Sequence, residues 1–253
     1  MTVQVVLVHG IRTSASMWRA QVETLAARGI TATAVDLPGH GTRMAETFTL
    51  AEAFATIDRA VRTAAERGPV LLVGHSMGGL LCTEYAGAID PPPIAGFVAA
   101  SCTSIPRGVG LRTYRALART VDALPDRGMW MTKRMLAATL PEETRADFGA
   151  GGYAFDTQDL ALSLLATLDV AGAVARIRVP LWFVNGQYDQ LRLHERLFTR
   201  LAPRAELIVV PRTSHLVTAM RPAAFDAVLA LAIATIDARH ASDPQDHGVS
   251  AQT

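Results

Sequence analysis

The sequence predicts an α/β fold in which a doubly wound, mostly parallel sheet of about six strands carries a helical cap. Six short apolar runs recur along the chain, at residues 3–8, 31–37, 70–74, 94–101, 179–185 and 205–210. Their near-continuous apolarity is typical of strands buried on both faces, as in a parallel sheet. Helix-forming stretches lie between most of these runs. Such alternation indicates right-handed crossovers from one strand to the next.

Residues that start or stop helices mark most of these stretches. Gly29 is suited to closing the first helix, and Thr49 with Glu52 three positions later forms a capping box that opens the second. The three prolines after Asp90 cannot continue the third. We therefore expect helices over residues 16–28, from residue 50 to just before Gly68, and over residues 76–90, 191–202 and 222–238.

The connection between the fourth and fifth strands is far longer than a parallel crossover requires. It shows helical signals but no convincing strand, and a connection of this length is usually an insertion with a role. Prolines and glycines divide it into expected helices at residues 108–124, 126–140 and 157–175. The predicted organisation is a core of residues 1–102 and 176–238, a helical lid at 103–175, and a polar, disordered tail at 239–253.

The composition excludes several functional classes. The chain has 253 residues, 50% of them hydrophobic, and its 24 basic and 23 acidic residues leave a net charge of +1. A dedicated nucleic-acid binder is usually markedly basic, so no such partner is expected. No stretch reaches the ~18 consecutive apolar residues of a membrane span. The first residues lack the positive flank and cleavage site of a secretory signal. We expect a soluble, cytoplasmic protein.

The motifs of common cofactors are missing. The two cysteines, Cys82 and Cys102, are too few for a disulfide scaffold or a four-ligand zinc site. The zinc-protease pattern HExxH, begun at His194, fails at Phe198, and no phosphate-binding GxxxxGKS/T or GxGxxG pattern follows a predicted strand. We therefore expect no metal and no cofactor, with a small molecule as the partner. Whether the chain is a monomer or a homodimer stays open.

The most specific signal is the pentapeptide Gly74-His75-Ser76-Met77-Gly78. It has the form G-x-S-x-G, follows an apolar strand and opens a helix-compatible run, which is the context of a nucleophile elbow. On such a turn, side chains at positions 74 and 78 would collide as the backbones approach, and the Ser76 hydroxyl projects from the end of the sheet. A chance match in a glycine-rich loop is the alternative, and the two correct flanks favour a nucleophile.

A serine nucleophile needs a base and a group that orients the base. His215 follows the last predicted strand, and Asp189 follows the strand before it, so both lie at the carboxyl end of the sheet, where ligands bind in open α/β folds. Taken singly, Asp189 could cap the helix at 191–202, and His215 could be an ordinary loop histidine. The order Ser76, Asp189, His215 matches the triad order of one hydrolase architecture and favours a catalytic reading.

Two backbone amides are candidates for stabilising a negative oxygen. The Met77 amide starts the helix after Ser76, and the Ile11 amide lies in the loop after the first strand, where Gly10 lets the backbone turn. We expect His9 to brace this loop, and we expect His40, in the turn after the second strand, to have no catalytic role.

Several motifs together resemble the α/β-hydrolase superfamily. They are HGIR followed by Trp18 at residues 9–18, DLPGHG at 36–41, GHSMGG at 74–79, NGQYD at 185–189 and SH at 214–215. The likeness spans residues 3–101 and 176–238, and the insertion carries no diagnostic motif. The resemblance implies a Ser–His–Asp hydrolase with a helical cap. It argues against epoxide hydrolases and haloalkane dehalogenases, which carry Asp where this chain has Ser76.

The expected substrate is small to medium and apolar. The helical insertion contains several methionines, and thioether side chains suit irregular pockets. Packing of these methionines onto the core is an equally good explanation. The residues expected to line the pocket are Arg12, Met129, Trp130, Met135 and Leu216. The predicted reaction is hydrolysis of a carboxylic ester, lactone or thioester through an acyl-enzyme. The alternatives are hydrolysis of a carbon–carbon bond by the same triad, and a small-molecule binding protein on this fold.

Overall fold

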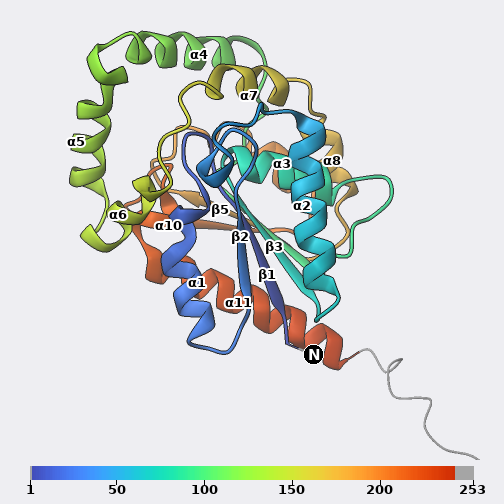
Figure 1. Ribbon diagram of the computed structural model, residues 1–253. Coiled ribbons are helices and arrows are strands. Elements are labelled where there is room, and N and C mark those ends of the chain that lie inside the picture. Colours follow the sequence, from blue (N-terminus) through green and yellow to red (C-terminus); the bar gives the residue numbers. More distant parts are fainter. Residues whose placement is uncertain (1, 243–253) are drawn as a thin grey trace, which may run out of the picture.

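The computed structural model describes residues 2–242 of the chain (Figure 1). Its centre is a parallel sheet of six strands in the order β2-β1-β3-β4-β5-β6. All six predicted strands are present, and the fold class is confirmed. The strands are β1 (Gln4–Val8), β2 (Ala32–Val35), β3 (Val70–His75), β4 (Gly96–Ala100), β5 (Leu181–Gly186) and β6 (Glu206–Val210).

The strand order reverses at β1. The chain passes from β1 to β2 on one side and then returns to place β3 on the other side, with Leu7 paired to Ala34 of β2 and to Val73 of β3. In open α/β sheets, ligands bind beyond the carboxyl ends of the strands at such a reversal. The loops after β1 and β3 therefore meet where a site is expected.

Helices cover both faces of the sheet. They are α1 (Arg19–Ala26) after a 3₁₀ turn at Ala15–Trp18, α2 (Leu50–Ala65), α3 (Met77–Ala86), α4 (Gly108–Asp122), α5 (Met129–Thr139), α6 (Glu142–Ala150), α7 (Gln158–Leu165), α8 (Val170–Arg176), α9 (Glu195–Leu201), α10 (Val217–Met220) and α11 (Pro222–Ala241). The N-cap predicted at Thr49 is formed, since the Thr49 side chain accepts a hydrogen bond from the Glu52 amide, whereas the Glu52 carboxylate accepts from Arg43.

Alternate residues of each strand point to opposite faces of the sheet and pack into two separate hydrophobic cores. In β3, Val70 and Leu72 face α2, α3, α7 and α8, whereas Leu71 and Val73 face α1 and α11. Figure 1 shows α1 and α11 on one side of the sheet and α2, α3 and α8 on the other. Burial on both faces explains why the strands are apolar without alternation.

Three helical predictions need correction. The stretch 157–175 forms two helices, α7 and α8, bent by 60°, because the Asp169 side chain caps a new start at the Gly172 amide. Helix α6 begins directly after Pro141, which was read as a break but is its N-cap. Helix α11 continues to Ala241, so residues 239–241 are not a tail. Of the rest of the predicted disordered tail, Ser242 is the C-cap of α11, and residues 243–253 lie outside the described residues.

The long connection between β4 and β5 contains helices α4 to α8. In Figure 1, α4 and α5 form an arch that stands away from the sheet, and α4 buries none of its residues. Helix α6 contacts the 3₁₀ turn before α1, whereas α7 and α8 pack against α3 and contribute to the core. Part of the expected lid region thus belongs to the layer over the sheet.

Within residues 2–242, no single helix is long and apolar enough to cross a membrane. Helices α7 and α8 have the required length and apolarity only when they are taken together, and they are bent by 60°.

Candidate active site

Ser76 lies on a strained turn between β3 and α3. Its backbone has φ 53° and ψ −115°, which is unusual for a residue other than glycine. A Cβ added at Gly74 would lie 2.7 Å from the Gly78 carbonyl oxygen, and one at Gly78 would overlap the carbonyl oxygens of His9 and Val8. The steric reason predicted for both glycines is confirmed.

Ser76, His215 and Asp189 come together at the carboxyl end of the sheet. His215 Nε2 lies 2.8 Å from Ser76 Oγ, and His215 Nδ1 lies 3.0 Å from Asp189 Oδ1. An ionised carboxylate only accepts hydrogen bonds, so Nδ1 carries the proton and Nε2 accepts the Ser76 hydroxyl proton. The result is a continuous chain of hydrogen bonds in which a base can activate a hydroxyl.

The Asp189 carboxyl is held in its ionised form. Burial alone would raise its pKa, but hydrogen bonds from His215 and from the Leu191 amide lower the pKa below its ordinary value. The fully buried Ser101, at the end of β4 with φ +52°, lies near enough to contribute to this lowering. Sequence reasoning missed Ser101, although its position at a strand end is the same signal that identified Asp189.

Asp189 does not cap the following helix. The structure starts α9 at Glu195, with His194 as its N-cap, and the Asp189 side chain instead accepts from the Leu191 amide. The loops that carry Asp189 and His215 approach closely, and a Cβ at Gly186 would overlap the Ser214 carbonyl.

His75 secures the loop that carries His215. It is buried, and its Nε2 donates a hydrogen bond of 2.9 Å to the His215 carbonyl oxygen. Burial lowers the pKa of His75 to about 4, with the neighbouring His215 acting in the same direction. His75 is therefore neutral at pH 7, and it supports the loop without being placed to exchange a proton with Ser76.

The loop after β1 is held so that the Ile11 amide is free. His9 Nδ1 donates to the Gly10 carbonyl oxygen at 2.7 Å, and His9 Nε2 accepts from the Leu37 amide at 3.0 Å. In a trans peptide the carbonyl and the next amide point in opposite directions, so fixing Gly10 O also orients the Ile11 N–H. A Cβ at Gly10 would lie 3.3 Å from Ser76 Cβ, which places this peptide against the serine.

Neither the Ile11 nor the Met77 amide donates to another group within residues 2–242. Met77 begins α3, where backbone amides lack partners within the helix. Both amides remain available to a ligand. The bracing role predicted for His9 is confirmed, and burial lowers its pKa to about 3.

Two other histidines have structural positions. His40 is buried, and its Nδ1 donates to the Pro38 carbonyl oxygen. His194 is half-buried; its Nδ1 accepts from the Ile105 amide, and its own amide donates to the Thr103 carbonyl. It ties the loop after β4 to the start of α9.

A cavity of about 270 Å³ opens above Ser76, between the sheet and the arch. Three of the five predicted pocket residues, Arg12, Met135 and Leu216, line it, as does the candidate oxyanion residue Ile11. Met129 and Trp130 do not. The face of α5 that borders the cavity carries Thr132, Met135, Leu136 and Thr139, at helical spacing.

Trp130 lies off that face, with 59% of its surface exposed, and Met129 is buried at the first residue of the helix. The expectation that they line the pocket is therefore wrong. The lining is also less apolar than expected, since it includes Tyr114, Tyr153 and Gln190 in addition to Arg12. Sequence spacing identified α5 but not which side of it turns inward.

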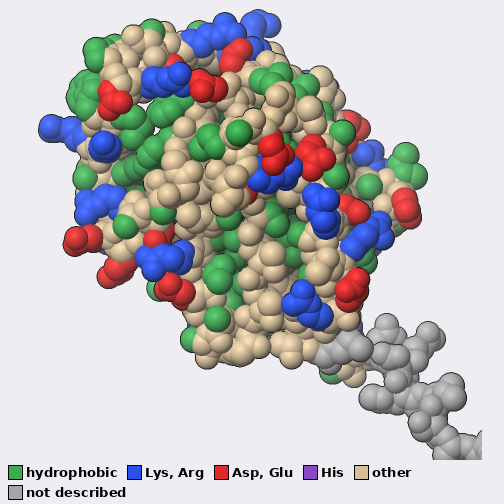
Figure 2. Space-filling model, in the orientation of Figure 1, with side chains coloured by type: hydrophobic (Ala, Val, Ile, Leu, Met, Phe, Trp, Pro, Cys, Tyr) green, Lys and Arg blue, Asp and Glu red, His purple; other side chains and the backbone are tan. Residues whose placement is uncertain are grey.

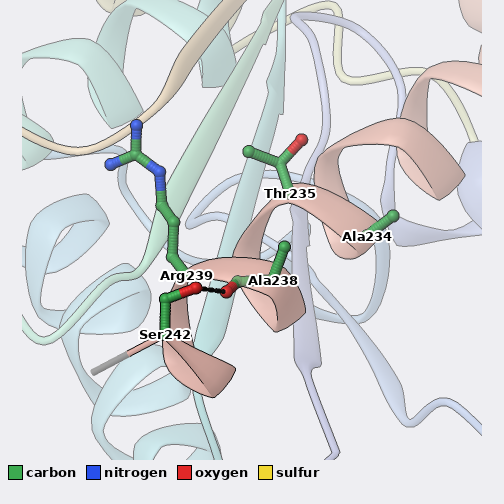
Figure 3. Close-up of a pocket in the computed structure, with 5 residues that line it drawn as sticks. All are labelled: Ala234, Thr235, Ala238, Arg239 and Ser242. Atoms are coloured by element: carbon green, nitrogen blue, oxygen red, sulfur yellow. Dashed lines mark hydrogen bonds between the residues drawn. The ribbon is translucent and has the colours of Figure 1, made fainter. Parts of the chain in front are cut away.

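A second hollow lies far from these residues in the fold. Figure 3 shows it near the end of α11, where it is lined by Ala234, Thr235, Ala238, Arg239 and Ser242. The Ser242 hydroxyl donates to the Ala238 carbonyl of the same helix. None of the five is a carboxylate or a histidine, so this hollow offers no acid–base group. Within residues 2–242, no group of three or more His, Cys, Asp or Glu side chains is placed to hold a metal ion.

Comparisons with known proteins agree with this architecture. A model of the alpha/beta hydrolase family matches residues 5–228. No protein with a curated description matches the chain by sequence.

Among solved structures, bromoperoxidase from Bacillus anthracis is similar with a TM-score of 0.76 and 19% identity over 92% of each chain. E-2-(acetamidomethylene)succinate hydrolase has a TM-score of 0.72 and 22% identity over 92% of each chain. A thermophilic esterase from Thermogutta terrifontis, solved with malate bound, has a TM-score of 0.72 and 20% identity, over 93% of this chain and 91% of that one. Identities this low show a common fold. Together with the family match over most of the sequence, they establish that this chain belongs to the alpha/beta hydrolase family.

Proposed function

We propose that this hydrolase cleaves a carboxylic ester, lactone or thioester through an acyl-enzyme on Ser76. The observation that carries the proposal is the continuous chain of hydrogen bonds from Asp189 through His215 to Ser76, at 3.0 and 2.8 Å, at the base of a cavity. The esterase from Thermogutta terrifontis has the same fold, which is compatible with this chemistry.

In the first half of the reaction, Ser76 Oγ attacks the carbonyl carbon of the substrate while His215 Nε2 takes the hydroxyl proton. The carbonyl oxygen becomes negative and accepts hydrogen bonds from the Ile11 and Met77 amides. The tetrahedral intermediate then collapses. The bond to the leaving group breaks, and His215 transfers its proton to the departing oxygen or sulfur.

The second half reverses these roles with water. His215 removes a proton from water as its oxygen attacks the acyl carbon, and the bond to Ser76 Oγ breaks as the proton returns to the serine. The carboxylate of Asp189 holds Nδ1 in its protonated form throughout and stabilises the imidazolium. The products are a carboxylic acid and the alcohol or thiol, and each step uses groups of this chain and one water molecule.

The arch of α4 and α5, together with α6, acts as a lid in this proposal. Its helices close the cavity on the side away from the sheet, with α5 contributing Met135 and Leu136 to the lining. Excluding bulk water strengthens the interactions between the oxyanion and the two amides. The position of the arch over the carboxyl ends of the strands supports this role.

A burst experiment separates ester hydrolysis from the alternatives. With p-nitrophenyl butyrate, we expect a burst of nitrophenolate stoichiometric with enzyme, followed by slower turnover. Ser76→Ala should lower kcat by at least ~10³-fold, whereas Ser163→Ala, on α7, should behave as wild type. Turnover of a ring-cleavage diketone without ester turnover would favour carbon–carbon hydrolysis. Saturable binding without turnover of either would indicate a receptor.

A further inference from the structure

One cation enters the cavity directly beside the candidate oxyanion site. Arg12 follows Ile11, lines the cavity together with Ser76, and has φ +64°. A residue other than glycine adopts this conformation at an energetic cost, and such residues concentrate at functional sites. The turn places Arg12 in the wall of the cavity that also contains Ser76.

The guanidinium of Arg12 is only partly satisfied by the protein. Its Nη2 donates to Asp122 Oδ1 at the end of α4, and its Cζ lies 4.8 Å from the centre of the Phe155 ring. Its Nε is buried and has no hydrogen-bond partner in the part of the chain that the structure describes. Buried donors are nearly always paired, and an unpaired one in a site points to a ligand.

Tyr114 adds a second donor to the same side of the cavity. It comes from α4, lines the cavity, and makes no hydrogen bond to another described residue through its hydroxyl. Burial raises the pKa of this hydroxyl, while the nearby Arg12 acts in the opposite direction. Tyr114 therefore stays protonated and can donate. A guanidinium and a phenol together match the acceptor oxygens of a carboxylate.

The arch carries a modest excess of positive charge. Residues 108–139, which span α4 and α5, contain six basic residues and two acidic ones, in a chain whose basic and acidic residues are nearly balanced. Figure 2 shows Lys and Arg side chains along the upper and left edges of the molecule, over these helices. Three of the six basic side chains are paired with carboxylates outside this stretch, Arg115 and Arg119 with Asp159 and Arg127 with Asp156, so the excess of positive charge left to attract an anionic ligand is small.

We propose that Arg12 and Tyr114 form a subsite for a carboxylate group on the acyl part of the substrate. The substrate class is then a half-ester or half-thioester of a short dicarboxylic acid, or a lactone that carries a carboxylate. Gly10 lies against Ser76, and Arg12 is only two residues further along the chain. This short separation and the small cavity limit the acid to a few carbons. This inference rests on the proposed function and replaces the expectation of an apolar acyl group.

The competing explanation is that Arg12 only fastens the arch to the core through Asp122. The two explanations predict opposite effects of Asp122→Asn. If Arg12 is a fastener, this change should be as harmful as the loss of Arg12 itself. If Arg12 binds substrate, it should leave the selectivity for an anionic substrate intact or raise it, because Asp122 no longer competes for the guanidinium.

The test compares two esters with the same leaving group and acyl length, mono-4-nitrophenyl glutarate and 4-nitrophenyl pentanoate. Wild type should have at least ~10-fold higher kcat/KM for the charged ester. Arg12→Gly suits a positive φ and removes the guanidinium. It should lower kcat/KM for the charged ester ~10- to 100-fold more than for the neutral one, and Arg12→Lys should fall between. Equal losses for both esters, or the same loss of selectivity in Asp122→Asn, would overturn the subsite.

A binding measurement keeps this inference separate from the proposed function. Calorimetry on Ser76→Ala protein should detect glutarate but not the neutral glutaramide, and the double variant with Arg12→Gly should lose glutarate binding. If neither ester is hydrolysed but glutarate binds through Arg12, the proposed hydrolysis fails and the subsite stands. If both esters are hydrolysed and glutarate does not bind, the subsite fails and the hydrolase stands.

Discussion

Two fully buried histidines beside Ser76 should make folding sensitive to mild acid. His9 and His75 have pKa values of about 3 and about 4, in both cases mainly because burial disfavours the charged imidazolium. Each also makes hydrogen bonds that depend on its neutral form: His9 accepts one from the Leu37 amide, and His75 donates one to the His215 carbonyl while its Nδ1 has no described partner.

The sign and size of the effect follow from proton binding. A histidine in the unfolded chain has a pKa of about 6.5, so between pH 6.5 and 4 the unfolded state binds a proton that the folded state does not. The free energy of unfolding is then fully present above pH 6.5. It falls by ~1.4 kcal/mol per pH unit and per histidine below that value. At pH 5 the loss is about 2 kcal/mol for each residue and about 4 kcal/mol for the pair.

Other buried groups alter the total loss of unfolding free energy at low pH, but not the difference between wild type and a histidine variant. His40, whose pKa burial also lowers, adds to the loss, while Glu84 and Asp226, whose pKa values burial raises, act in the opposite direction. Differences between wild type and single variants isolate the contributions of His9 and His75.

Urea unfolding at pH 7.5 and pH 5.0 measures these differences. Between the two pH values, His9→Gln and His75→Gln should each lose about 2 kcal/mol less than wild type. The matched control His240→Gln, at an exposed position near the end of α11, should lose as much as wild type. If both buried-site variants lose as much as wild type, these histidines are not kept neutral by the fold, and the account of the supporting hydrogen bonds is wrong.

Three further substitutions test the site. Asp189→Asn should lower kcat by up to ~10⁴-fold with an unchanged circular dichroism spectrum, because Nδ1 of His215 would no longer be held protonated; a loss below tenfold would contradict its role. Gly78→Ala should lower both the melting temperature and kcat, since its Cβ has no space against the backbone after β1; wild-type values would refute the steric argument. Trp130→Ala should leave the chain-length preference for graded p-nitrophenyl esters unchanged, whereas Met135→Ala should re-rank them by ~1–3 kcal/mol; the reverse pattern would place the pocket elsewhere.

The sheet was predictable because each strand carries its own signal. Strands buried on both faces must be apolar throughout, and the six runs were found on that basis alone. The helices of the long connection were harder to predict. Pro141 was read as an interruption, yet a proline is well tolerated at a helix start, and Glu142 and Glu143 in the first turn favour one there. The split between α7 and α8 was missed although Asp169, a good N-cap residue, marks the start of the second helix.

The positions of Ser76, Asp189 and His215 could be inferred because parallel strands deliver their following loops to one edge of the sheet. The cavity above these three residues could not be inferred from the sequence. Its polar wall depends on the positive φ of Arg12 and on the side of α4 and α5 that turns inward, and both follow from how the arch rests on the core. Only the structure brings Tyr114, more than a hundred residues from Arg12, to the same wall.

Labelling with a fluorophosphonate tests the central claim most directly, because the reagent reacts with an activated serine. We expect a single adduct per chain by intact mass, mapped to the peptide that contains Ser76, with a labelling rate that falls sharply in Asp189→Asn. Ser76→Ala should take up no label while remaining folded. An adduct on Ser14, Ser16 or Ser214, or undiminished labelling of Ser76→Ala, would contradict the assignment of Ser76 as the nucleophile.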